Sequence, residues 1–205
     1  MTTDIPRLTL VILSHNRCAE LRATLAIYRS APEWLEIIVV DNGSSDGSAA
    51  MVRAEFPAVQ IIANPDNRGT GGRNQGIAAA RAAVVVTLDD DSTVAPECLP
   101  AIADYFSAHP RVAAVGLRVL LADGSDEPWF VWPRRGDEEH GYLSPSLMTC
   151  GAAFRKNAVL AVGGFWEPYQ VYVEERDLCT RLIAAGGEVR YLPRWAAQSG
   201  LGAYS

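Results

Sequence analysis

The stretch "VVVTLDDDSTV", residues 84–94, runs from a continuous apolar segment directly into three carboxylates. A short apolar run bounded by polar residues is typical of a strand that is buried on both faces of a parallel sheet. Neighbouring carboxylates repel one another and raise one another's pKa, a cost that a divalent cation removes. The stretch therefore predicts a buried strand that ends at a metal or ligand site; a solvated acidic turn is the alternative interpretation.

The segments around this strand repeat its pattern, because short runs rich in Val and Ile alternate with amphipathic segments of helical length. The predicted strands are Leu8–Leu13, Glu36–Val40, Val59–Ala63, Val84–Leu88 and Val112–Leu120. The predicted helices are Cys18–Arg29, Ser48–Glu55, Arg73–Arg81 and Pro96–Ala108. This alternation predicts an α/β protein with a mostly parallel central sheet and helices on both faces.

Each of the first four predicted strands ends in a polar cluster. The clusters are "SHNR" (14–17), "DNGSSDGS" (41–48), "NPDNRGTGG" (64–72) and "DDDS" (89–92). In an open α/β sheet the carboxyl ends of the strands share one edge, and ligands bind there. We therefore expect the four clusters to line a single crevice.

Composition narrows the class of protein. The 205 residues suit one domain, and a net charge of −6 with dispersed Arg and Lys argues against nucleic acid as a partner. The four cysteines lack the C-x-x-C spacing of a zinc or redox site. The N-terminus lacks a signal-peptide pattern and no apolar run is long enough to cross a bilayer, so we expect a cytoplasmic protein without a transmembrane segment.

The glycine-rich loop at residues 69–72 fails the dinucleotide fingerprint G-x-G-x-x-G, because Asn74 stands where its third glycine is required. Glycines instead let the backbone pass close to a ligand, and Arg73 at the start of a helix favours a diphosphate. A flexible turn with a surface arginine is the alternative. Asp41 either accepts from a nucleobase or caps its turn, and the local sequence favours the cap.

The second half of the chain is less regular between residues 122 and 145, and then predicts a helix over Glu174–Ala185 and a strand over Glu188–Leu192. On that helix Glu175 falls at the centre of the apolar stripe, with Glu174 to its side and Asp177 facing away. The stripe comprises Leu178, Cys179, Leu182 and Ile183. An inward carboxylate at a helix start is either a partner of the helix dipole or a positioned base.

Taken together, six motifs resemble the family 2 inverting glycosyltransferases of GT-A fold, in the branch of rhamnosyl- and galactosyltransferases. The motifs follow the family's order and span nearly the whole chain: "VILSHNR" (11–17), "IIVVDNGSSDGS" (37–48), "NRGTGGRNQGI" (67–77), "VTLDDDS" (86–92), "GAAFRKNAVLAVGGF" (151–165) and "EERDLCTRL" (174–182). The resemblance implies a nucleotide-binding half over about residues 1–120 and an acceptor and catalytic half over about residues 121–205 of one domain.

The resemblance also implies roles for individual residues. Asp91 and Asp89 hold Mn²⁺ or Mg²⁺, and Glu175 is the catalytic base, with Asp177 as a second catalytic candidate in the same motif. Glu175 stands where the family usually has Asp. The donor nucleotide and its diphosphate are contacted by Ser14, Asn16, Arg17, Asp41, Asn67, Gly72, Arg73, Asp89 and Asp90.

The implied reaction is metal-dependent transfer of a sugar from a nucleoside diphosphate sugar to a hydroxyl acceptor, with inversion. The acceptor is a glycan, a lipid-linked saccharide or a small molecule, and a lipid-linked acceptor implies peripheral contact with the inner face of the membrane. We expect the acceptor between Trp129–Trp132 and the Gly163–Phe165 turn, because aromatic faces stack on sugar rings. Core aromatics in an irregular segment are the alternative.

One departure from the family concerns the metal. Many relatives carry a histidine after the last strand, where this chain offers Gln198, and none of its three histidines (His15, His109 and His140) matches that place. Either metal binding is weaker, another group substitutes, or the chain lacks a C-terminal acceptor segment. A non-catalytic nucleotide-sugar binding protein is therefore an alternative function, and a nucleotidyltransferase a more distant one.

Overall fold

The computed structural model describes residues 6–127, 136–169 and 173–200. The strands are β1 (Leu8–Ser14), β2 (Leu35–Asp41), β3 (Gln60–Ala63), β4 (Val84–Asp89), β5 (Ser92–Val94), β6 (Val112–Leu120), β7 (Gly136–Asp137), β8 (Gly141–Leu143), β9 (Ala152–Arg155) and β10 (Glu188–Ser199). The α-helices are α1 (Cys18–Ile27), α2 (Ser48–Glu55), α3 (Arg73–Ala79), α4 (Leu99–Ala108), α5 (Lys156–Ala161) and α6 (Glu174–Ala184). Short 3₁₀ helices are η1 (Gly69–Gly72), η2 (Pro96–Cys98) and η3 (Thr149–Gly151).

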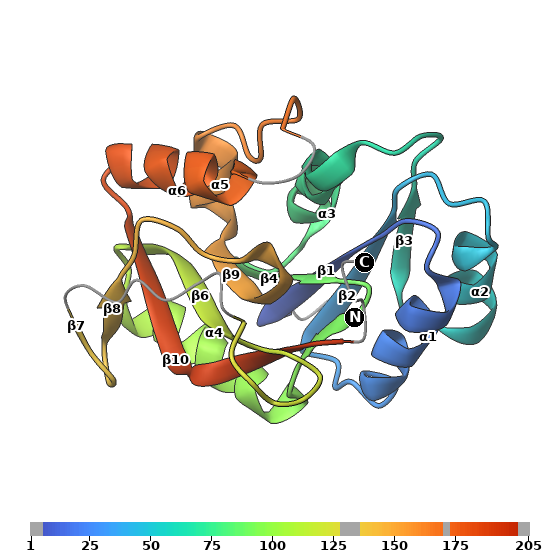
Figure 1. Ribbon diagram of the computed structural model, residues 1–205, viewed down its shortest axis with the longest axis horizontal. Helices are drawn as coiled ribbons and strands as arrows, with labels where there is room; N and C mark the ends of the chain where they lie inside the picture. Colours follow the sequence, from blue (N-terminus) through green and yellow to red (C-terminus); the bar gives the residue numbers. More distant parts are fainter. Residues whose placement is uncertain (1–5, 128–135, 170–172, 201–205) are drawn as a thin grey trace, which may run out of the picture.

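All the strands of the described chain belong to one sheet, with the order β3-β2-β1-β4-β9-β6-β10-β8-β7 and with β5 paired to β10 (Figure 1). Strands β3, β2, β1 and β4 are parallel neighbours, and β10 runs parallel to β6. Strand β9 is antiparallel to both β4 and β6 and joins the two parallel groups. The prediction of a mostly parallel core is therefore confirmed.

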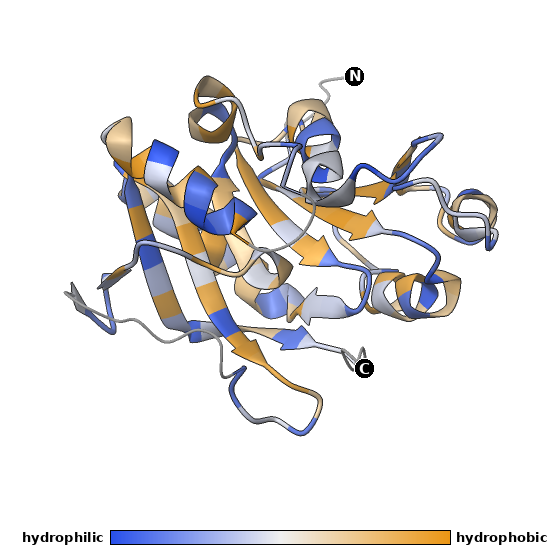
Figure 2. Cartoon of the chain, turned by 45° about the horizontal axis from the view of Figure 1, so that its top comes forward, coloured by the Kyte–Doolittle hydropathy of each residue, from blue (hydrophilic) through white to orange (hydrophobic). Residues whose placement is uncertain are grey.

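Side chains that alternate along the central strands build two hydrophobic layers, one on each face of the sheet. On β1, Leu10 and Ile12 pack into the layer that includes α1, α2 and α4, whereas Val11 packs into the layer of α3, α5 and α6. Figure 2 shows the central strands as hydrophobic and the loops beyond their arrowheads as hydrophilic. Helices thus cover both faces, and the polar edge of the sheet is free to hold a site.

The register of the parallel strands places their carboxyl ends level with one another. Ser14 at the end of β1 lies opposite Asp41 at the end of β2, and the preceding Leu13 lies opposite Asp89 at the end of β4. The expectation that the polar clusters share one edge is confirmed for these strands.

The structure differs from the sequence-based expectation most clearly in β10, which runs to Ser199 rather than ending at Leu192. Pro193 cannot donate a hydrogen bond to a neighbouring strand, so the sequence alone predicts that the strand ends before it. Here the register of β10 against β6 shifts between Leu192 and Ala196, a bulge that carries the strand past the proline. The continuation brings Ser199 opposite Ser92, next to the acid triplet.

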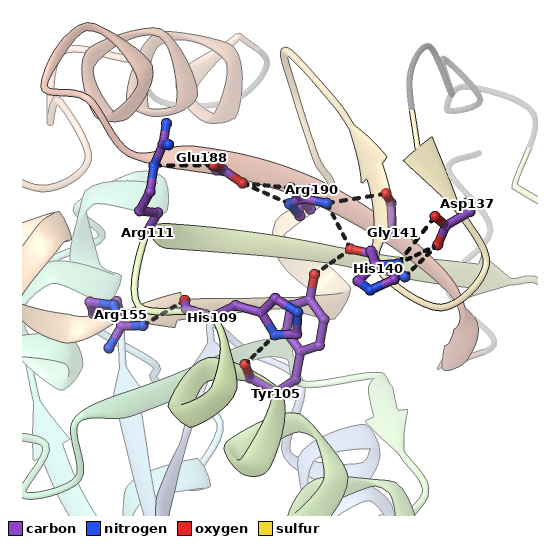
Figure 3. A network of polar contacts seen from close by, with 9 residues as sticks. All are labelled: Tyr105, His109, Arg111, Asp137, His140, Gly141, Arg155, Glu188 and Arg190. Carbon is purple, nitrogen blue, oxygen red and sulfur yellow. Dashed lines mark hydrogen bonds and ion pairs between the residues drawn. The ribbon is translucent and has the colours of Figure 1, made fainter.

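A polar network holds the β7–β8 hairpin against α4 and β10 (Figure 3). The Tyr105 hydroxyl and the Arg190 guanidinium both donate to the carbonyl oxygen of His140, at 2.5 and 2.9 Å. Arg190 also donates to Glu188, which pairs with Arg111 at 3.3 Å. Because Arg111 and Glu188 stand at the amino ends of β6 and β10, the network lies at the edge opposite the acid triplet.

Within the described residues, no helix is both long enough and apolar enough to cross a membrane.

Candidate functional site

Two loops at the carboxyl edge are fastened to each other by hydrogen bonds. The amide oxygen of Asn16 accepts from the backbone N–H of Ser45 at 2.7 Å, and the Asn16 backbone N–H donates to the Ser44 hydroxyl at 2.9 Å. Asn16 has a φ of 53°, a left-handed conformation that asparagine adopts more readily than most residues. Asp41 is buried and accepts from the Ser44 N–H at 3.1 Å, so the turn-capping interpretation of Asp41 is confirmed.

The loop that contains Asn67 is organised by Asn42, whose side chain makes four hydrogen bonds. Its amide nitrogen donates to Asn67 Oδ1 and to the Gly69 carbonyl, both at 2.9 Å. Its amide oxygen accepts from Asn64 and from the Arg68 N–H, both at 3.2 Å. Sequence reasoning assigned no role to Asn42; its place directly after a buried strand, next to a predicted site residue, was the available signal.

The glycines of this loop allow close packing at the start of α3. A Cβ atom on Gly72 would lie 2.9 Å from the Asn42 amide oxygen and 3.0 Å from a Leu13 methyl group. A Cβ on Gly76 would lie 2.4 Å from a methyl carbon of Val11, so α3 lies directly on β1. The atoms that these glycines approach are those of the protein itself, and the expected approach to a ligand stays a prediction.

Arg73 is the first residue of α3, and its side chain is only 3% exposed. One guanidinium nitrogen, Nη2, forms an ion pair with Oδ1 of Asp89. Its Nε and Nη1 atoms are buried without a hydrogen-bond partner among the described residues. Because buried donors without partners are costly, the arginine is arranged for a ligand that accepts hydrogen bonds.

The acid triplet follows β4, where each aspartate meets a different environment. Asp91 Oδ2 lies 2.9 Å from Arg17 Nη1, and Asp90 Oδ1 lies 3.5 Å from Arg17 Nε. The Asp89 backbone N–H donates to the Ser92 hydroxyl at 2.7 Å. Strand β4 ends at Asp89, and Asp90 and Asp91 form the turn that follows it.

Burial shifts the protonation of the triplet. It raises the pKa of Asp90 to about 6, although the Ser14 hydroxyl and the Arg17 guanidinium lower it. Burial also raises the pKa of Asp91, again against the lowering effect of Arg17. Two guanidinium groups thus compensate three neighbouring carboxylates, and a further cation would bring the carboxylates fully into the charged form.

The acid triplet offers donor atoms for the metal that the resemblance implies. Asp89 and Asp91 supply hard carboxylate oxygens, and Mg²⁺ is usually bound by one or two carboxylates together with substrate phosphates. Across residues 6–127, 136–169 and 173–200 no group of three or more His, Cys, Asp or Glu residues could hold a metal ion. The Gln198 amide donates to the Leu121 carbonyl at 2.6 Å and is therefore engaged elsewhere. The donor set fits a cation that takes its remaining ligands from a diphosphate.

Helix α6 begins with two acids that differ in exposure. Glu174 is 3% exposed, and its Oε2 atom has no hydrogen-bond partner among the described residues. Glu175 is partly buried; burial, followed by the charge of Glu174, raises its pKa to about 7, while Arg73 lowers it. The sequence placed Glu174 to the side of the apolar stripe, and this prediction is wrong because Glu174 is the more buried of the two acids. The sequence also placed Ile183 in the stripe, and this is wrong because Ile183 is 45% exposed.

Asp177 lies two residues further along α6, and its carboxylate is engaged by Arg181, with Oδ2 2.9 Å from Nε. Arg181 in turn donates to the carbonyl oxygens of Val162 and Gly164, at 2.6 and 2.7 Å. The pair thereby fastens α6 to the turn that follows α5. This arrangement favours a positioning role for Asp177 over proton transfer.

A cavity of about 640 Å³ lies away from these acids, at the amino edge of the sheet. Its lining includes Leu25, Arg29, Phe56 and Arg81, and none of the predicted site residues. The arginines there are already engaged, Arg29 over the Phe56 ring and Arg81 with Glu36. The chemistry-bearing residues therefore gather at the opposite edge. Trp129 and Trp132 lie outside the described residues.

A family model described as "Glycosyl transferase family 2" matches residues 9–162, most of the chain. The chain therefore belongs to glycosyl transferase family 2. The predicted resemblance is confirmed at the level of the family.

Curated relatives agree with that assignment. "Succinoglycan biosynthesis protein ExoO" of Rhizobium meliloti is 36% identical over 58% of this chain and 36% of its own length. "Pre-mycofactocin glycosyltransferase" of Mycobacterium tuberculosis is 30% identical over 90% of this chain and 41% of its own length. An "N-acetylglucosaminyl-diphospho-decaprenol L-rhamnosyltransferase" of the same species is 26% identical, over 83% and 67%. The chain thus spans about two fifths of the length of the first two relatives.

Solved structures share the fold. The "Mannosyltransferase PcManGT from Pyrobaculum calidifontis in complex with GDP-Man and Mn2+" superposes with a TM-score of 0.74 at 23% identity, over 98% of this chain and 58% of that one. GalNAc-T7, solved "with UDP, GalNAc and Mn2+", gives a TM-score of 0.76 at 17% identity, over 96% and 44%. The GT-A fold that the motifs predicted is therefore confirmed.

Proposed function

We propose that this chain transfers a sugar from a nucleoside diphosphate sugar to a hydroxyl acceptor, with inversion at the anomeric carbon. The observation that carries the proposal is the buried Arg73 guanidinium, which has two donors without partners and pairs with Asp89 at the carboxyl edge. A diphosphate supplies the acceptors that this guanidinium lacks. Glu175 lies close enough for Arg73 and Asp89 both to act on its pKa.

The donor nucleotide binds over the joined loops after β1 and β2. Ser14 and Asp41 stand level at the ends of these strands, and Asn16 and Asn67 shape the loops through their hydrogen bonds. Gly72 leaves the space at the start of α3 that brings Arg73 to the diphosphate. Arg17 connects the loop after β1 to the acid triplet, because its guanidinium pairs with Asp90 and Asp91.

Asp91 and Asp89 would hold Mn²⁺ or Mg²⁺, a cation that supplies charge neutralisation of the departing diphosphate when it is bound. Two structural neighbours were solved with Mn²⁺ together with a nucleotide or nucleotide sugar, which supports this part of the proposal.

Glu175 acts as the general base. Its carboxylate takes the proton of the acceptor hydroxyl while that oxygen bonds to the anomeric carbon, and the bond from that carbon to the diphosphate oxygen breaks on the opposite face. The electron pair of the broken bond leaves with the diphosphate. A pKa of about 7 suits this role, because a base with a pKa near the working pH is both deprotonated and sufficiently basic.

The acceptor class is proposed from the relatives. The name of one describes rhamnosyl transfer to a decaprenol-linked saccharide, and another is an "Undecaprenyl-phosphate 4-deoxy-4-formamido-L-arabinose transferase". Transfer of a hexosyl or deoxyhexosyl group to a saccharide or lipid-linked glycan fits the first name, whereas the second name describes a pentosyl group and a lipid phosphate. The two names share a lipid-linked acceptor. A lipid-linked acceptor would bring the chain to the membrane surface as a peripheral protein.

The proposal is tested by incubating the purified chain with Mn²⁺ and a panel of UDP-, GDP- and dTDP-sugars and measuring release of the nucleoside diphosphate. Wild type is expected to turn over at least one donor, and Glu175→Gln to lose that turnover while still binding the nucleotide. Equal rates in the two proteins would rule out Glu175 as the base. Nucleotide binding without turnover in wild type would favour a non-catalytic binding protein.

A further inference from the structure

The segment that follows α5 is pinned to the donor-side loop at two points. Asn74 on α3 donates to the Phe165 carbonyl and accepts from the Phe165 N–H, both at 2.8 Å. Further along, the Thr70 hydroxyl donates to the Tyr169 carbonyl at 3.2 Å. These bonds fix residues 165–169 against η1 and the start of α3.

Between the two anchors the chain turns one aromatic ring inward and another outward. Phe165 is 1% exposed and packs edge-to-face on Phe154 in the core. Trp166, the next residue, is 54% exposed and contacts the ring of Tyr169 at 5.0 Å between centroids, with the ring planes at 86°. Packing in the core accounts for the position of the Phe165 ring. Trp166 is 54% exposed, so its ring is available to a ligand.

This aromatic pair lies close to the proposed chemistry. Thr70, which holds Tyr169, precedes Arg73 by three residues, a length of chain that reaches at most about 11 Å. Glu167 packs directly on η1, since a Cβ atom on Gly71 would lie 2.8 Å from its Cγ atom. The segment then leads to α6, which carries Glu175.

The chemistry of this surface fits a sugar ring. Two rings at a right angle form an apolar corner, the Tyr169 hydroxyl belongs to one of them, and the exposed Glu167 follows Trp166 directly in the chain. A pyranose presents an apolar C–H face and hydroxyl groups around its edge, which matches such a surface. A hydrocarbon chain could not form a hydrogen bond with the carboxylate. The proposed site for the nucleobase lies at the loops after β1 and β2.

We propose that Trp166 and Tyr169 form a platform on which the pyranose ring of the acceptor stacks, with Glu167 accepting from one of its hydroxyl groups. This rests on the proposed function and deepens it, because it gives the acceptor class as a saccharide and places its binding on the α3 side of Glu175.

The test is saturation-transfer NMR with a panel of methyl pyranosides of gluco, galacto, manno, rhamno and N-acetylglucosamine configuration. Wild type is expected to saturate the C–H protons of at least one sugar. Trp166→Ala and Tyr169→Ala are expected to weaken binding of that sugar about fivefold to tenfold, the worth of one aromatic contact. Trp166→Phe, which keeps a stacking ring, is expected to lie between them and wild type.

Leu160→Ala is the matched control, because Leu160 is an exposed large apolar side chain (43%) on the neighbouring α5 that lies outside the platform. It is expected to bind sugars as wild type does. A wild-type protein that saturates no sugar of the panel would overturn the inference, and so would equal saturation in wild type and Trp166→Ala.

Nucleotide binding separates this inference from the proposed function. Thermal shifts of wild type with UDP, GDP and dTDP in the presence of Mn²⁺ report the donor site without any acceptor. A saccharide signal that depends on Trp166 in a protein that binds none of these nucleotides would refute the donor site and leave the platform. Nucleotide binding with no dependence on Trp166 for saccharides would do the reverse.

Discussion

The two groups of acids at the carboxyl edge have similar residues in different surroundings. The triplet after β4 faces two guanidinium groups, with Arg73 on Asp89 and Arg17 on the other two aspartates. The pair at the start of α6 has no ion pair with a cation in the described part of the chain, and there the pKa of Glu175 reaches about 7. The difference shows that surroundings, rather than residue type, set the protonation of similar acids.

The strongest test of this contrast removes the unpaired acid. Glu175→Gln keeps the size of the side chain and loses the base, so turnover is expected to fall by about 10²-fold to 10⁴-fold. Nucleotide affinity is expected to stay unchanged, because the proposed donor site lies at the other group of acids. Steady-state kinetics with the best donor measure the first effect and calorimetric titration the second. The exposed Glu97→Gln is the control and is expected to match wild type.

The second test breaks the paired group. Asp89→Asn leaves the buried Arg73 without its counter-charge, and the unfolding free energy is expected to fall by about 2–3 kcal/mol, since Asp89 itself is partly exposed. Urea denaturation measures the change. Asp126→Asn removes an ion pair between two exposed partners, with Arg118, and is expected to cost clearly less than Asp89→Asn. Equal losses of unfolding free energy in Asp89→Asn and Asp126→Asn would show that the burial of Arg73 does not strengthen its ion pair with Asp89.

A third change loosens the loop next to the paired acids. Asn42→Ala leaves four hydrogen-bonding partners behind, and the expected loss of unfolding free energy is about 2 kcal/mol, together with weaker nucleotide binding. The exposed Asn157→Ala on α5 serves as the matched substitution, with an expected change near zero. A nucleotide affinity that survives Asn42→Ala would separate the loop from the donor site.

A fourth test concerns the pH dependence of stability. The pKa of Glu175 in the folded protein, about 7, lies above its ordinary value of 4.5, so the folded state holds the proton more tightly than the unfolded state. Its contribution to stability is therefore complete below about pH 4.5 and is lost as the pH rises through about 7. Urea denaturation from about pH 5 to pH 8 is expected to show this decline, and Glu175→Gln to reduce it. An unchanged slope in the variant would assign the decline to other groups, such as Asp90.

The sequence was sufficient for the parallel half of the fold, because Val- and Ile-rich runs such as Val84–Leu88 are buried on both faces and have a clear periodicity. It was insufficient for β9, because its four residues "AAFR" lack such a run and pair with β4 and β6, two strands that lie far earlier in the chain. The strand predicted from the sequence also ended too early at Leu192, because the bulge that accommodates Pro193 depends on the register of β10 against β6.

The candidate site shows the same division. Asp89, Asp91 and Glu175 stand out in the sequence as acids next to apolar patterns, and the structure brings Asp89 and Glu175 within electrostatic reach of Arg73. Asn42 and Asn74 form hydrogen bonds with Asn67 and Phe165, and the sequence alone does not predict these partners. The buried Glu174 was misplaced because helical periodicity ignores the strands and turns that pack against the first turn of α6.

The most direct test of the central claim is the anomalous signal of Mn²⁺ in crystals soaked with manganese and the nucleoside diphosphate that binds best. The account predicts a manganese peak between Asp89 and Asp91, with the diphosphate on Arg73 and Glu175 facing the same space. A nucleotide in the cavity lined by Arg29 and Arg81, at the opposite edge of the sheet, with manganese absent from the triplet, would contradict it.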